Sequence, residues 1–417
     1  MVGCILGRNK TIMFLGAGEE QCEAIEIALD LGLKVIAVDG NPKAVGLNIA
    51  HIGINADIKD IQAMIKIGKK YKINGVMTHA VEIPQVVAKI AKKLGLPGIS
   101  PEVAERATNK WKRLKCLTKN AIPCAKFEIA RTIEEAERKV DKIGFPVVFK
   151  PVDNAGARGV IKVRNKEEVK DSFNHTKKYT FKNVILIEEF LEGRELSTES
   201  IIYDNKIYSV AFSDRNYNKK NFYPFFIEDG GEMPTSLSED ELKKVIETIN
   251  AAIRALGINW GVAKGDIIIG SNGKVRIIEM AARTSGGRFC SLKVPLSTGI
   301  NMLRPLILMT VGISPDLDDL KPKFSKGIAE RFIFPKPGRI VQVKGIEEAK
   351  KMEGIYKIHI DEDIKVGGIV EPVIDHTKRK GYVIGMGKTR EEAVYRTERA
   401  VQKIKIVTIN QNLANGN

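Results

Sequence analysis

Short apolar runs and longer amphipathic segments alternate through the first hundred residues. The apolar runs cover residues 11–15, 34–38 and 74–78. The segments with helical spacing of their apolar positions cover residues 19–31, 59–70 and 84–94. Because strands separated by helix-length crossovers pair in parallel, we predict a doubly wound parallel sheet in an N-terminal α/β domain at residues 1–108.

The remainder of the chain divides into three segments with different patterns. Residues 109–183 combine helices with short strands, and we predict a small lobe there. Residues 184–310 hold longer apolar strands and a helix at 239–256, which indicates a central lobe. Residues 311–417 hold short strands punctuated by Gly and Pro and end in a helix at 391–404, so we predict a small mixed α+β lobe at the C-terminus.

An apolar hairpin with one acid on each arm is the most informative local pattern. The segments VAKGDIII and KVRIIEM flank an Asn272-Gly273 pair, which is the preferred sequence of a two-residue hairpin turn. That turn would pair Ser271 with Lys274 and Asp266 with Glu279. Two solvated charges on an exposed hairpin are the alternative, and it is disfavoured by the apolar neighbours Ile267, Ile268, Ile269, Ile277 and Ile278.

Two directly opposed carboxylates require a positive charge between them. Like charges at opposed positions destabilise a sheet, and a divalent cation would remove the repulsion. Mg²⁺ prefers one or two carboxylates together with water and phosphate oxygens. We therefore predict a magnesium–nucleotide site at Asp266 and Glu279, with Mn²⁺ as the alternative ion.

A lysine at the end of a buried strand leads into a loop of small residues. Residues 145–150 form the strand that ends in Lys150, and the loop at 151–160 contains Asn154, Gly156, Arg158, Gly159 and Val160. Glycines let backbone amides approach phosphate oxygens, and the cations add charge, so the loop resembles a phosphate clamp. The Walker pattern GxxxxGK[ST] is missing, and a plain hairpin is the alternative reading.

A second buried strand, residues 184–191, ends in Glu188-Glu189-Phe190-Leu191. Its backbone can present donors and acceptors to an adenine edge, and Glu195 can accept from ribose hydroxyls. An edge strand with exposed glutamates is the alternative for this piece taken alone.

Taken in order, these motifs resemble the ATP-grasp superfamily over essentially the whole chain. The segments EMAARTSGG, AERFIFPKPGRI and GYVIGMGKTREEAV are similar to the L-amino-acid ligase group of carboxylate–amine ligases. The turn at 16–20 and Glu82 resemble formate-dependent glycinamide ribonucleotide transformylase. The resemblance implies a pre-ATP-grasp domain, a two-lobed ATP-grasp region and a C-terminal lobe.

The same resemblance implies roles for individual residues. Lys110, Lys150 and the loop Asn154 to Val160 would contact ATP phosphates. Glu188, Phe190 and Leu191 would meet adenine, Glu195 the ribose, and Asp266 and Glu279 magnesium. Arg283 would stabilise the acyl phosphate. The remaining substrate contacts would be Glu19, Glu20, Glu82, Ser285, Gly286 and Gly287. Two positions depart from the pattern: Ala281 stands where many relatives have Asn, which leaves the number of metal ions open, and Lys264 stands where several have His.

The chain has 417 residues and a formal net charge of +16, which raises the question of a nucleic-acid partner. The lysines are spread along helix faces without a nucleic-acid-binding motif, so we expect no such partner. We interpret Lys112, Arg113 and Lys115 as a solvated helix face, with Lys110 as the exception. No apolar run is long enough for a membrane span, and we expect a cytoplasmic protein. The five cysteines (Cys4, Cys22, Cys116, Cys124 and Cys290) lack metal or disulfide spacing and are expected to be reduced packing residues.

The leading functional hypothesis is an ATP-dependent ligase that activates a carboxylate as an acyl phosphate and joins it to an amine, releasing ADP and phosphate. Carbamoyl-phosphate synthesis and biotin carboxylation are alternatives within the superfamily. An NAD-dependent oxidoreductase would use Gly16-Ala17-Gly18 and Asp39, but Gln21 replaces the third glycine of that fingerprint. A non-catalytic basic binding module is a third reading. The acid and the amine stay open, and a homodimer is compatible with the resemblance.

Overall fold

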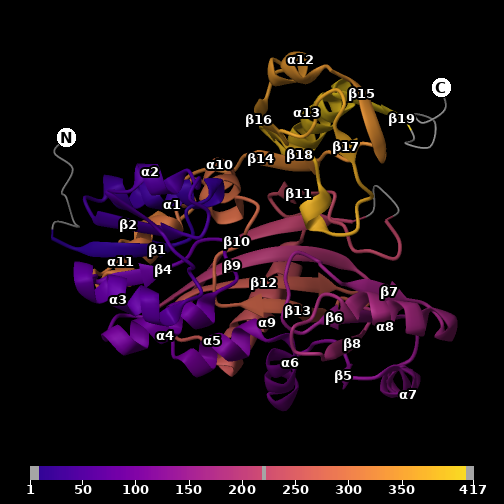
Figure 1. Cartoon of the computed structure of the whole chain (residues 1–417), viewed down its shortest axis with the longest axis horizontal. Helices are drawn as coiled ribbons and strands as arrows, with labels where there is room; N and C mark the ends of the chain where they lie inside the picture. Colours follow the sequence, from indigo (N-terminus) through magenta and orange to yellow (C-terminus); the bar gives the residue numbers. More distant parts are fainter. Residues whose placement is uncertain (1–8, 218–221, 410–417) are drawn as a thin grey trace.

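The computed structural model of the chain describes residues 9–217 and 222–409, and the described strands form four sheets (Figure 1). Cys4 lies outside these residues. The other four cysteines carry free thiols, and only Cys290 among them is fully buried. None of the described helices is long and apolar enough to cross a membrane.

The N-terminal domain is built on a parallel sheet of strand order β3-β2-β1-β4. The strands are β1 (Thr11–Leu15), β2 (Lys34–Asp39), β3 (Ile52–Asn55) and β4 (Gly75–Met77). The helices are α1 (Glu19–Asp30), α2 (Gly46–Ile49), α3 (Ile61–Tyr71), α4 (Pro84–Leu94) and α5 (Pro101–Thr108). Alternate residues of β1 enter different cores on the two faces of the sheet, which confirms the predicted doubly wound α/β arrangement.

The small lobe is an antiparallel sheet of order β5-β8-β6-β7, covered by two helices. Its strands are β5 (Phe127–Ala130), β6 (Val147–Pro151), β7 (Ile161–Val163) and β8 (Ile185–Glu189). Its helices are α7 (Ile133–Ile143) and α8 (Val169–Lys177), preceded along the chain by α6 (Lys110–Lys119). β8 begins after the predicted boundary at residue 183, yet it pairs with β5 and β6, so the sheet of the small lobe extends to residue 189.

An eight-stranded sheet of order β13-β12-β9-β10-β11-β14-β18-β16 forms the centre of the molecule. The strands from the predicted central lobe are β9 (Arg194–Tyr203), β10 (Lys206–Asn216), β11 (Gly230–Met233), β12 (Gly261–Ile269) and β13 (Val275–Ala281). The strands from the predicted C-terminal lobe are β14 (Gly327–Phe332), β16 (Ile355–Ile360) and β18 (Gly381–Gly387). The sheet therefore continues across the predicted boundary at residue 310.

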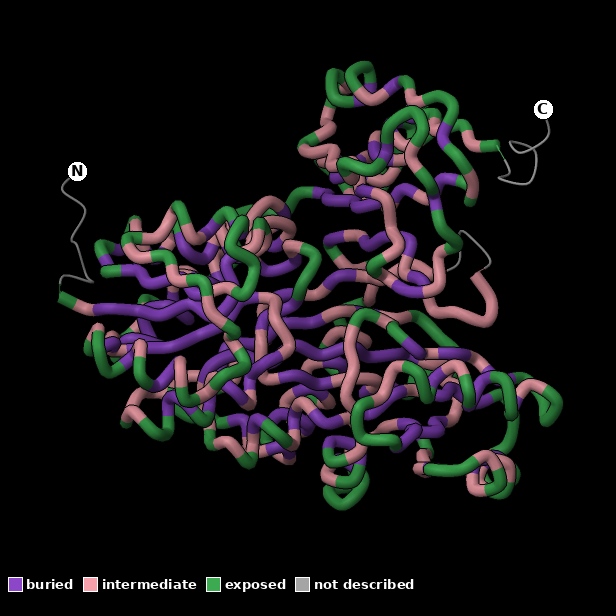
Figure 2. Tube along the Cα trace, viewed as in Figure 1, coloured by how far each residue is buried: buried purple, intermediate pink, exposed green. Residues whose placement is uncertain are grey.

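Helices and a small sheet complete the C-terminal half. The helices of this half are α9 (Glu239–Leu256), α10 (Val294–Thr298), α11 (Leu303–Thr310), α12 (Ile346–Lys350) and α13 (Arg390–Lys403). The small sheet has the order β17 (Ile369–Val370), β15 (Gly338–Lys344) and β19 (Lys405–Ile409). A shared apolar core joins the N-terminal sheet to the large sheet through α11, and buried segments run through the middle of both (Figure 2).

The hairpin of β12 and β13 brings Asp266 opposite Glu279, as predicted. The turn itself differs, because Ile269 pairs with Val275 and Gly270 donates its N–H to the Lys274 carbonyl. Residues 271–273 are left as a loop of three residues instead of two. Gly273 takes the left-handed conformation with φ +70°. The longer loop shifts the register by one residue, and an irregularity between Asp266 and Ile267 shifts it back. The predicted pair of Ser271 with Lys274 is wrong, since Gly270 takes that place and donates its N–H to the Lys274 carbonyl at 3.1 Å.

Gly193 offers a test of how closely the strands leading into the cavity are packed. A Cβ at this position would lie 2.1 Å from the Ile269 carbonyl oxygen, and the residue has φ +154°. We expect Gly193→Ala to lower the free energy of unfolding by ~3 kcal/mol, because backbone must move to admit the methyl group. Urea denaturation measures this value. Gly273→Ala is the matched control, since its Cβ would meet nothing within 4 Å. The control should lose only ~1 kcal/mol from left-handed strain, and an equal loss in both variants would contradict the close packing.

Candidate active site

A cavity of about 390 Å³ is lined by residues of the small lobe, the large sheet and the segment that follows β13. Sixteen of the residues predicted to bind nucleotide, metal or substrate line it: Lys110, Lys150, Asn154, Gly156, Arg158, Val160, Glu188, Phe190, Leu191, Glu195, Asp266, Glu279, Arg283, Ser285, Gly286 and Gly287. Gly159, Glu19, Glu20 and Glu82 do not. The predicted residues that line the cavity lie up to 177 positions apart, from Lys110 to Gly287.

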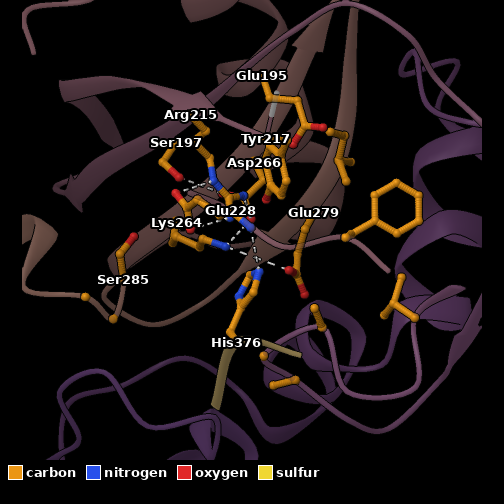
Figure 3. Close-up of a pocket in the computed structure, with 18 of the residues that line it drawn as sticks. Glu195, Ser197, Arg215, Tyr217, Glu228, Lys264, Asp266, Glu279, Ser285 and His376 are labelled. Atoms are coloured by element: carbon orange, nitrogen blue, oxygen red, sulfur yellow. Dashed lines mark hydrogen bonds and ion pairs between the residues drawn. The ribbon is translucent and has the colours of Figure 1, made fainter. Parts of the chain in front are cut away.

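The acid pair Asp266 and Glu279 lies on adjacent strands, and the ammonium of Lys264 sits between the two carboxylates (Figure 3). Lys264 forms an ion pair with Asp266, and its Nζ lies 3.7 Å from Glu279 Oε2. Arg215 Nη1 lies 3.0 Å from Asp266 Oδ2, and the Ser197 hydroxyl donates to Asp266 Oδ1 at 3.0 Å. Protein cations thus supply the positive charge that opposed acids require.

Cations outweigh burial in setting the charge state of both acids. Burial would raise the pKa of Asp266, but Arg215 and Lys264 hold that pKa below its usual value. Burial opposes ionisation of Glu279 as well, and Lys264, Arg113 and Lys110 bring its pKa well below the ordinary range. Both carboxylates are therefore ionised at neutral pH and act as acceptors for a cation.

The donor set of this acid pair fits a divalent ion bound together with a nucleotide. Ionised oxygen ligands on neighbouring strands are the protein contribution that Mg²⁺ uses, and phosphate oxygens and water complete its shell. Within residues 9–217 and 222–409, no three His, Cys, Asp or Glu side chains gather as a metal site by themselves. Asp266 and Glu279 would hold the ion from one side only.

The prediction that Arg113 belongs to a solvated face of α6 is wrong, because its side chain is buried. Its side chain is 2% exposed, and its guanidinium donates to the carbonyl oxygens of Ala107 at 3.0 Å and Met280 at 3.3 Å. Arg113 Nη2 also lies 3.7 Å from Glu279 Oε1. The run of lysines around Arg113 hid this contact, because helical spacing alone does not say which face of α6 is buried.

One side of the cavity, where we predicted phosphate contacts, brings together the predicted lysines and the small-residue loop. Lys110 Nζ donates to the Asn154 carbonyl, and burial lowers the pKa of Lys110. Lys150 Nζ lies 2.7 Å from Glu188 Oε2, so this predicted adenine contact is an ion-pair partner as well. Arg158 Nε donates to Asn154 Oδ1 at 2.8 Å. The loop is thereby braced by its own polar side chains.

Gly159 supports the loop from outside the cavity. It has φ +72°, and a Cβ there would lie 2.7 Å from the Tyr179 side chain. Only glycine lets the backbone pass this close to Tyr179 in a left-handed conformation.

The wall of the cavity where we predicted adenine contacts contains the aromatic rings of Phe190 and Phe226. Phe190 lies 6.1 Å from Phe226 between ring centroids, and the Lys162 ammonium lies 3.4 Å from the Phe190 centroid. Glu195 stands at the edge of this wall, and burial raises its pKa to about 7 despite the nearby Arg215. These surroundings fit a flat, apolar ring such as a nucleobase, with Glu195 placed to accept hydrogen bonds from hydroxyl groups attached to it.

An ion-pair chain that the sequence did not predict continues from Asp266 across the cavity. Arg215 holds Glu228 through two contacts of 3.1 Å, and Arg379 Nη2 lies 3.3 Å from Glu228 Oε2. These cations lower the pKa of Glu228 far below its usual value against the effect of burial. The alternation of Ser213, Arg215 and Tyr217 along β10 and its continuation was a signal that could have identified Arg215 as a residue facing a pocket.

The C-terminal half contributes the loop of His376 and Arg379 to the same cavity. The Glu228 backbone N–H donates to His376 Nε2 at 3.4 Å, and the His376 N–H donates to the Gly156 carbonyl at 3.2 Å. Burial and the charge of Arg379 lower the pKa of His376 to about 3, so this imidazole is neutral. No local motif in the sequence signalled this loop.

Arg283 and the segment after it close the end of the cavity next to the N-terminal domain. Arg283 forms an ion pair with Glu82 and donates to the Thr284 carbonyl at 2.9 Å. His79 Nδ1 lies 2.8 Å from Thr284 Oγ1. Glu82 therefore reaches the site through Arg283, although it does not line the cavity.

The acids of the first glycine-rich turn lie beside the same segment but outside the cavity. Glu20 Oε1 accepts from the Arg288 N–H at 2.6 Å, and Glu19 Oε2 lies 3.2 Å from Arg288 Nη2. The carboxylate of Asp39 accepts the N–H groups of Ala17 and Asn41, both at 2.8 Å. Asp39 braces the turn with both oxygens, which disfavours a ribose-binding role in a dinucleotide site.

Comparisons with known proteins agree with this geometry. Residues 107–287 match the ATP-grasp domain, and residues 331–408 match the L-amino acid ligase C-terminal domain 2. Alanine–anticapsin ligase of Bacillus subtilis is 24% identical over 62% of this chain and 58% of that protein. Formate-dependent phosphoribosylglycinamide formyltransferase of Prochlorococcus marinus is 24% identical over 95% of this chain and 97% of that protein. The crystal structure of L-amino acid ligase from Bacillus licheniformis has a TM-score of 0.82 at 22% identity, covering 96% of this chain and 99% of that one, which shows a shared fold. The predicted resemblance is confirmed.

Arg113 provides a test of the buried charges around Glu279. We expect Arg113→Met to lower the free energy of unfolding by about 3 kcal/mol, because it leaves buried acceptors and an acid without their cation. Lys112→Met is the matched control on the same helix, since Lys112 pairs only at the surface with Glu105 and should change stability by less than about 1 kcal/mol. Urea denaturation of both variants measures the difference. Equal stability of the two would mean that Arg113 is dispensable to the site.

Proposed function

We propose that this chain, an enzyme with an ATP-grasp domain and an L-amino acid ligase C-terminal domain 2, is an ATP-dependent ligase that joins a carboxylate to an amine. The carboxylate attacks the γ-phosphorus of ATP, giving an acyl phosphate and ADP. The amine then attacks the acyl carbon and displaces phosphate. The observation that carries the proposal is one cavity in which an ionised acid pair faces a basic, glycine-containing loop, with Arg283 beside them.

The small lobe would bind the nucleotide. Lys110, Lys150 and the loop at 154–160 are proposed to contact the phosphates, where backbone amides and ammonium groups neutralise charge. Phe190 and Leu191 would pack on adenine, with Glu188 at its edge, and Glu195 would accept from the ribose hydroxyls. The aromatic contacts of Phe190 and the position of Glu195 at the cavity wall support these roles.

Asp266 and Glu279 would hold magnesium, with Mn²⁺ as an alternative because it accepts the same oxygen ligands. The bound ion would neutralise charge on the phosphates during transfer. The residues of the chain prepare the site: Arg215 and Ser197 fix the Asp266 carboxylate, and Arg113 fixes that of Glu279. Ala281 has no side-chain ligand atom, so we propose that Glu279 is the only side chain of β13 that binds the ion.

Arg283 is proposed to stabilise the acyl phosphate and the oxyanion formed when the amine adds to it. A planar guanidinium can donate two parallel hydrogen bonds to a phosphate or an oxyanion, and donors of this kind are worth most in a water-poor cavity. Its ion pair with Glu82 and its hydrogen bond to the Thr284 carbonyl hold the guanidinium in place.

The loop Ser285 to Gly287 would pass along the acyl group on the side of the amine. Glu19 and Glu20 are proposed to serve this side as well, through the Arg288 contacts that anchor the end of the loop. Small-molecule carboxylates and amines are thus the expected substrates.

A screen of carboxylates and amines for magnesium-dependent release of ADP and phosphate tests the proposal. With the active pair, Glu279→Gln should lose a magnesium ligand and Arg283→Ala a donor to the oxyanion, and each should reduce turnover by ~100-fold or more. Chelation of magnesium by EDTA should stop the wild-type reaction.

Arg254→Ala is the matched control, because this arginine is exposed on α9 away from the cavity. It should retain wild-type turnover. Undiminished turnover in both site variants, with the fold intact by circular dichroism, would refute the assigned site.

A further inference from the structure

A second buried acid, Glu199, lies under the loop that follows Arg283. It is on β9, where Glu195, Ser197 and Glu199 occupy alternate positions and so share one face of the sheet. Ser197 reaches Asp266 and Glu195 lines the cavity, whereas Glu199 lies opposite Lys264 on β12 and is 0% exposed. The row of side chains that forms the floor of the cavity therefore continues beneath Ser285.

Glu199 is tied to the loop by one oxygen only. Its Oε1 accepts the N–H of Ser285. Its Oε2 and the Ser285 hydroxyl are both buried, and neither makes a hydrogen bond of good geometry to the described residues. Ser285 lines the cavity and Glu199 does not. The Ser285 hydroxyl and the Cys290 thiol both face this carboxylate. A buried acid whose hydrogen bonds are incomplete thus lies between the sheet and the cavity, at a position where burial is costly without a function.

The second step of the proposed reaction needs a proton acceptor at this end of the cavity. An amine reaches the enzyme as an ammonium ion and must lose one proton before its lone pair can attack the acyl carbon. Asp266 and Glu279 are unsuited to accept it, because their cations hold both pKa values low. Burial raises the pKa of Glu199 to about 7, where a carboxylate accepts a proton effectively at neutral pH.

Two other buried groups compare unfavourably with Glu199. His79 lies behind the same loop, but burial and Arg283 lower its pKa to about 4, which makes it a weak base. Glu195 has a raised pKa too, but it lies at the nucleotide end of the row beside Arg215 and Asp266. The charged and titratable groups that face Glu199 are Lys264 across the strand pair, Arg283 and the Cys290 thiol, with Glu20 beyond that thiol.

We propose that Ser285 and Glu199 form a proton relay for the attacking amine, in which the Ser285 hydroxyl contacts the substrate and Glu199 is the final acceptor. The inference rests on the proposed ligase function. One proton passes from the ammonium to Ser285 Oγ while the hydroxyl proton passes to Glu199. The nitrogen lone pair then forms the C–N bond. The acyl C–O bond breaks, its electron pair leaves with phosphate, and the second nitrogen proton is lost to the released phosphate.

A comparison of two nucleophiles distinguishes removal of the proton from the amine from all other steps of the reaction. Hydroxylamine is largely uncharged at neutral pH and needs no acceptor before it attacks, whereas an amino acid enters as an ammonium ion. Glu199→Gln keeps an oxygen for the Ser285 N–H but cannot take up a proton. We expect this variant to form amide ~100-fold more slowly and to keep hydroxamate formation within about threefold of wild type.

The pH profile gives an independent readout. In wild type, amide formation should rise with pH through about 7, because Glu199 accepts a proton only in its ionised form and its folded pKa lies there. Hydroxamate formation should lack this rise, and so should both activities of Glu199→Gln. Glu247→Gln, at an exposed position of α9, is the matched control and should behave as wild type.

Ser285→Ala keeps the test decisive if Glu199→Gln does not fold. It removes the hydroxyl, keeps the backbone N–H, and should likewise slow amide formation while sparing hydroxamate formation. Equal loss of both products in a folded variant, or loss of neither, would overturn the relay while leaving the ligase function standing. A wild-type enzyme that forms no hydroxamate from ATP and any carboxylate would instead overturn the ligase function, and the relay with it.

Discussion

The site depends on the compensation of two acids that face each other across adjacent strands. Asp266 and Glu279 could not stay ionised side by side in a buried sheet without positive charge around them. Lys264 between them, Arg215 on one flank and Arg113 on the other supply that charge. Because these neighbouring cations already keep both carboxylates ionised, an incoming metal ion can bind them without first having to displace their protons.

The same charges link the hairpin to loops that lie outside the strands of the large sheet. Arg215 also pairs with Glu228, and Glu228 pairs with Arg379 of the C-terminal half. Positive and negative side chains therefore alternate along one chain of contacts. The loop of Arg379 also reaches the glycine-rich loop of the small lobe, through the bond from His376 to Gly156. Replacing one member therefore leaves a buried partner uncompensated, which is more costly than the loss of a surface ion pair.

Three polar groups that are buried without a full set of partners lie at or behind the loop that follows Arg283. His79 Nε2, Glu199 Oε2 and the Ser285 hydroxyl are all unsatisfied among the described residues. A fold selected for stability alone would pair or remove such groups. Their position at the end of the cavity that is proposed to receive the amine favours a chemical role over a structural one.

The sequence by itself determined the features that depend on neighbours along the chain. Strand and helix periodicity identified the N-terminal sheet, and the small-residue loop and the hairpin identified Lys150, Asn154, Asp266 and Glu279, because these signals arise within a few residues. Tertiary structure decided what periodicity cannot encode: which face of α6 is buried, and hence the role of Arg113; the contacts of Arg215 with Glu228 and Arg379; and the pairing of Glu19 and Glu20 with Arg288. Even the pairing of Asp266 with Glu279 depends on an irregularity in the strand register, because the turn is one residue longer than predicted. The physical reason is that the charge and burial of a side chain are set by partners far away in the sequence, and only the folded chain brings those partners within reach.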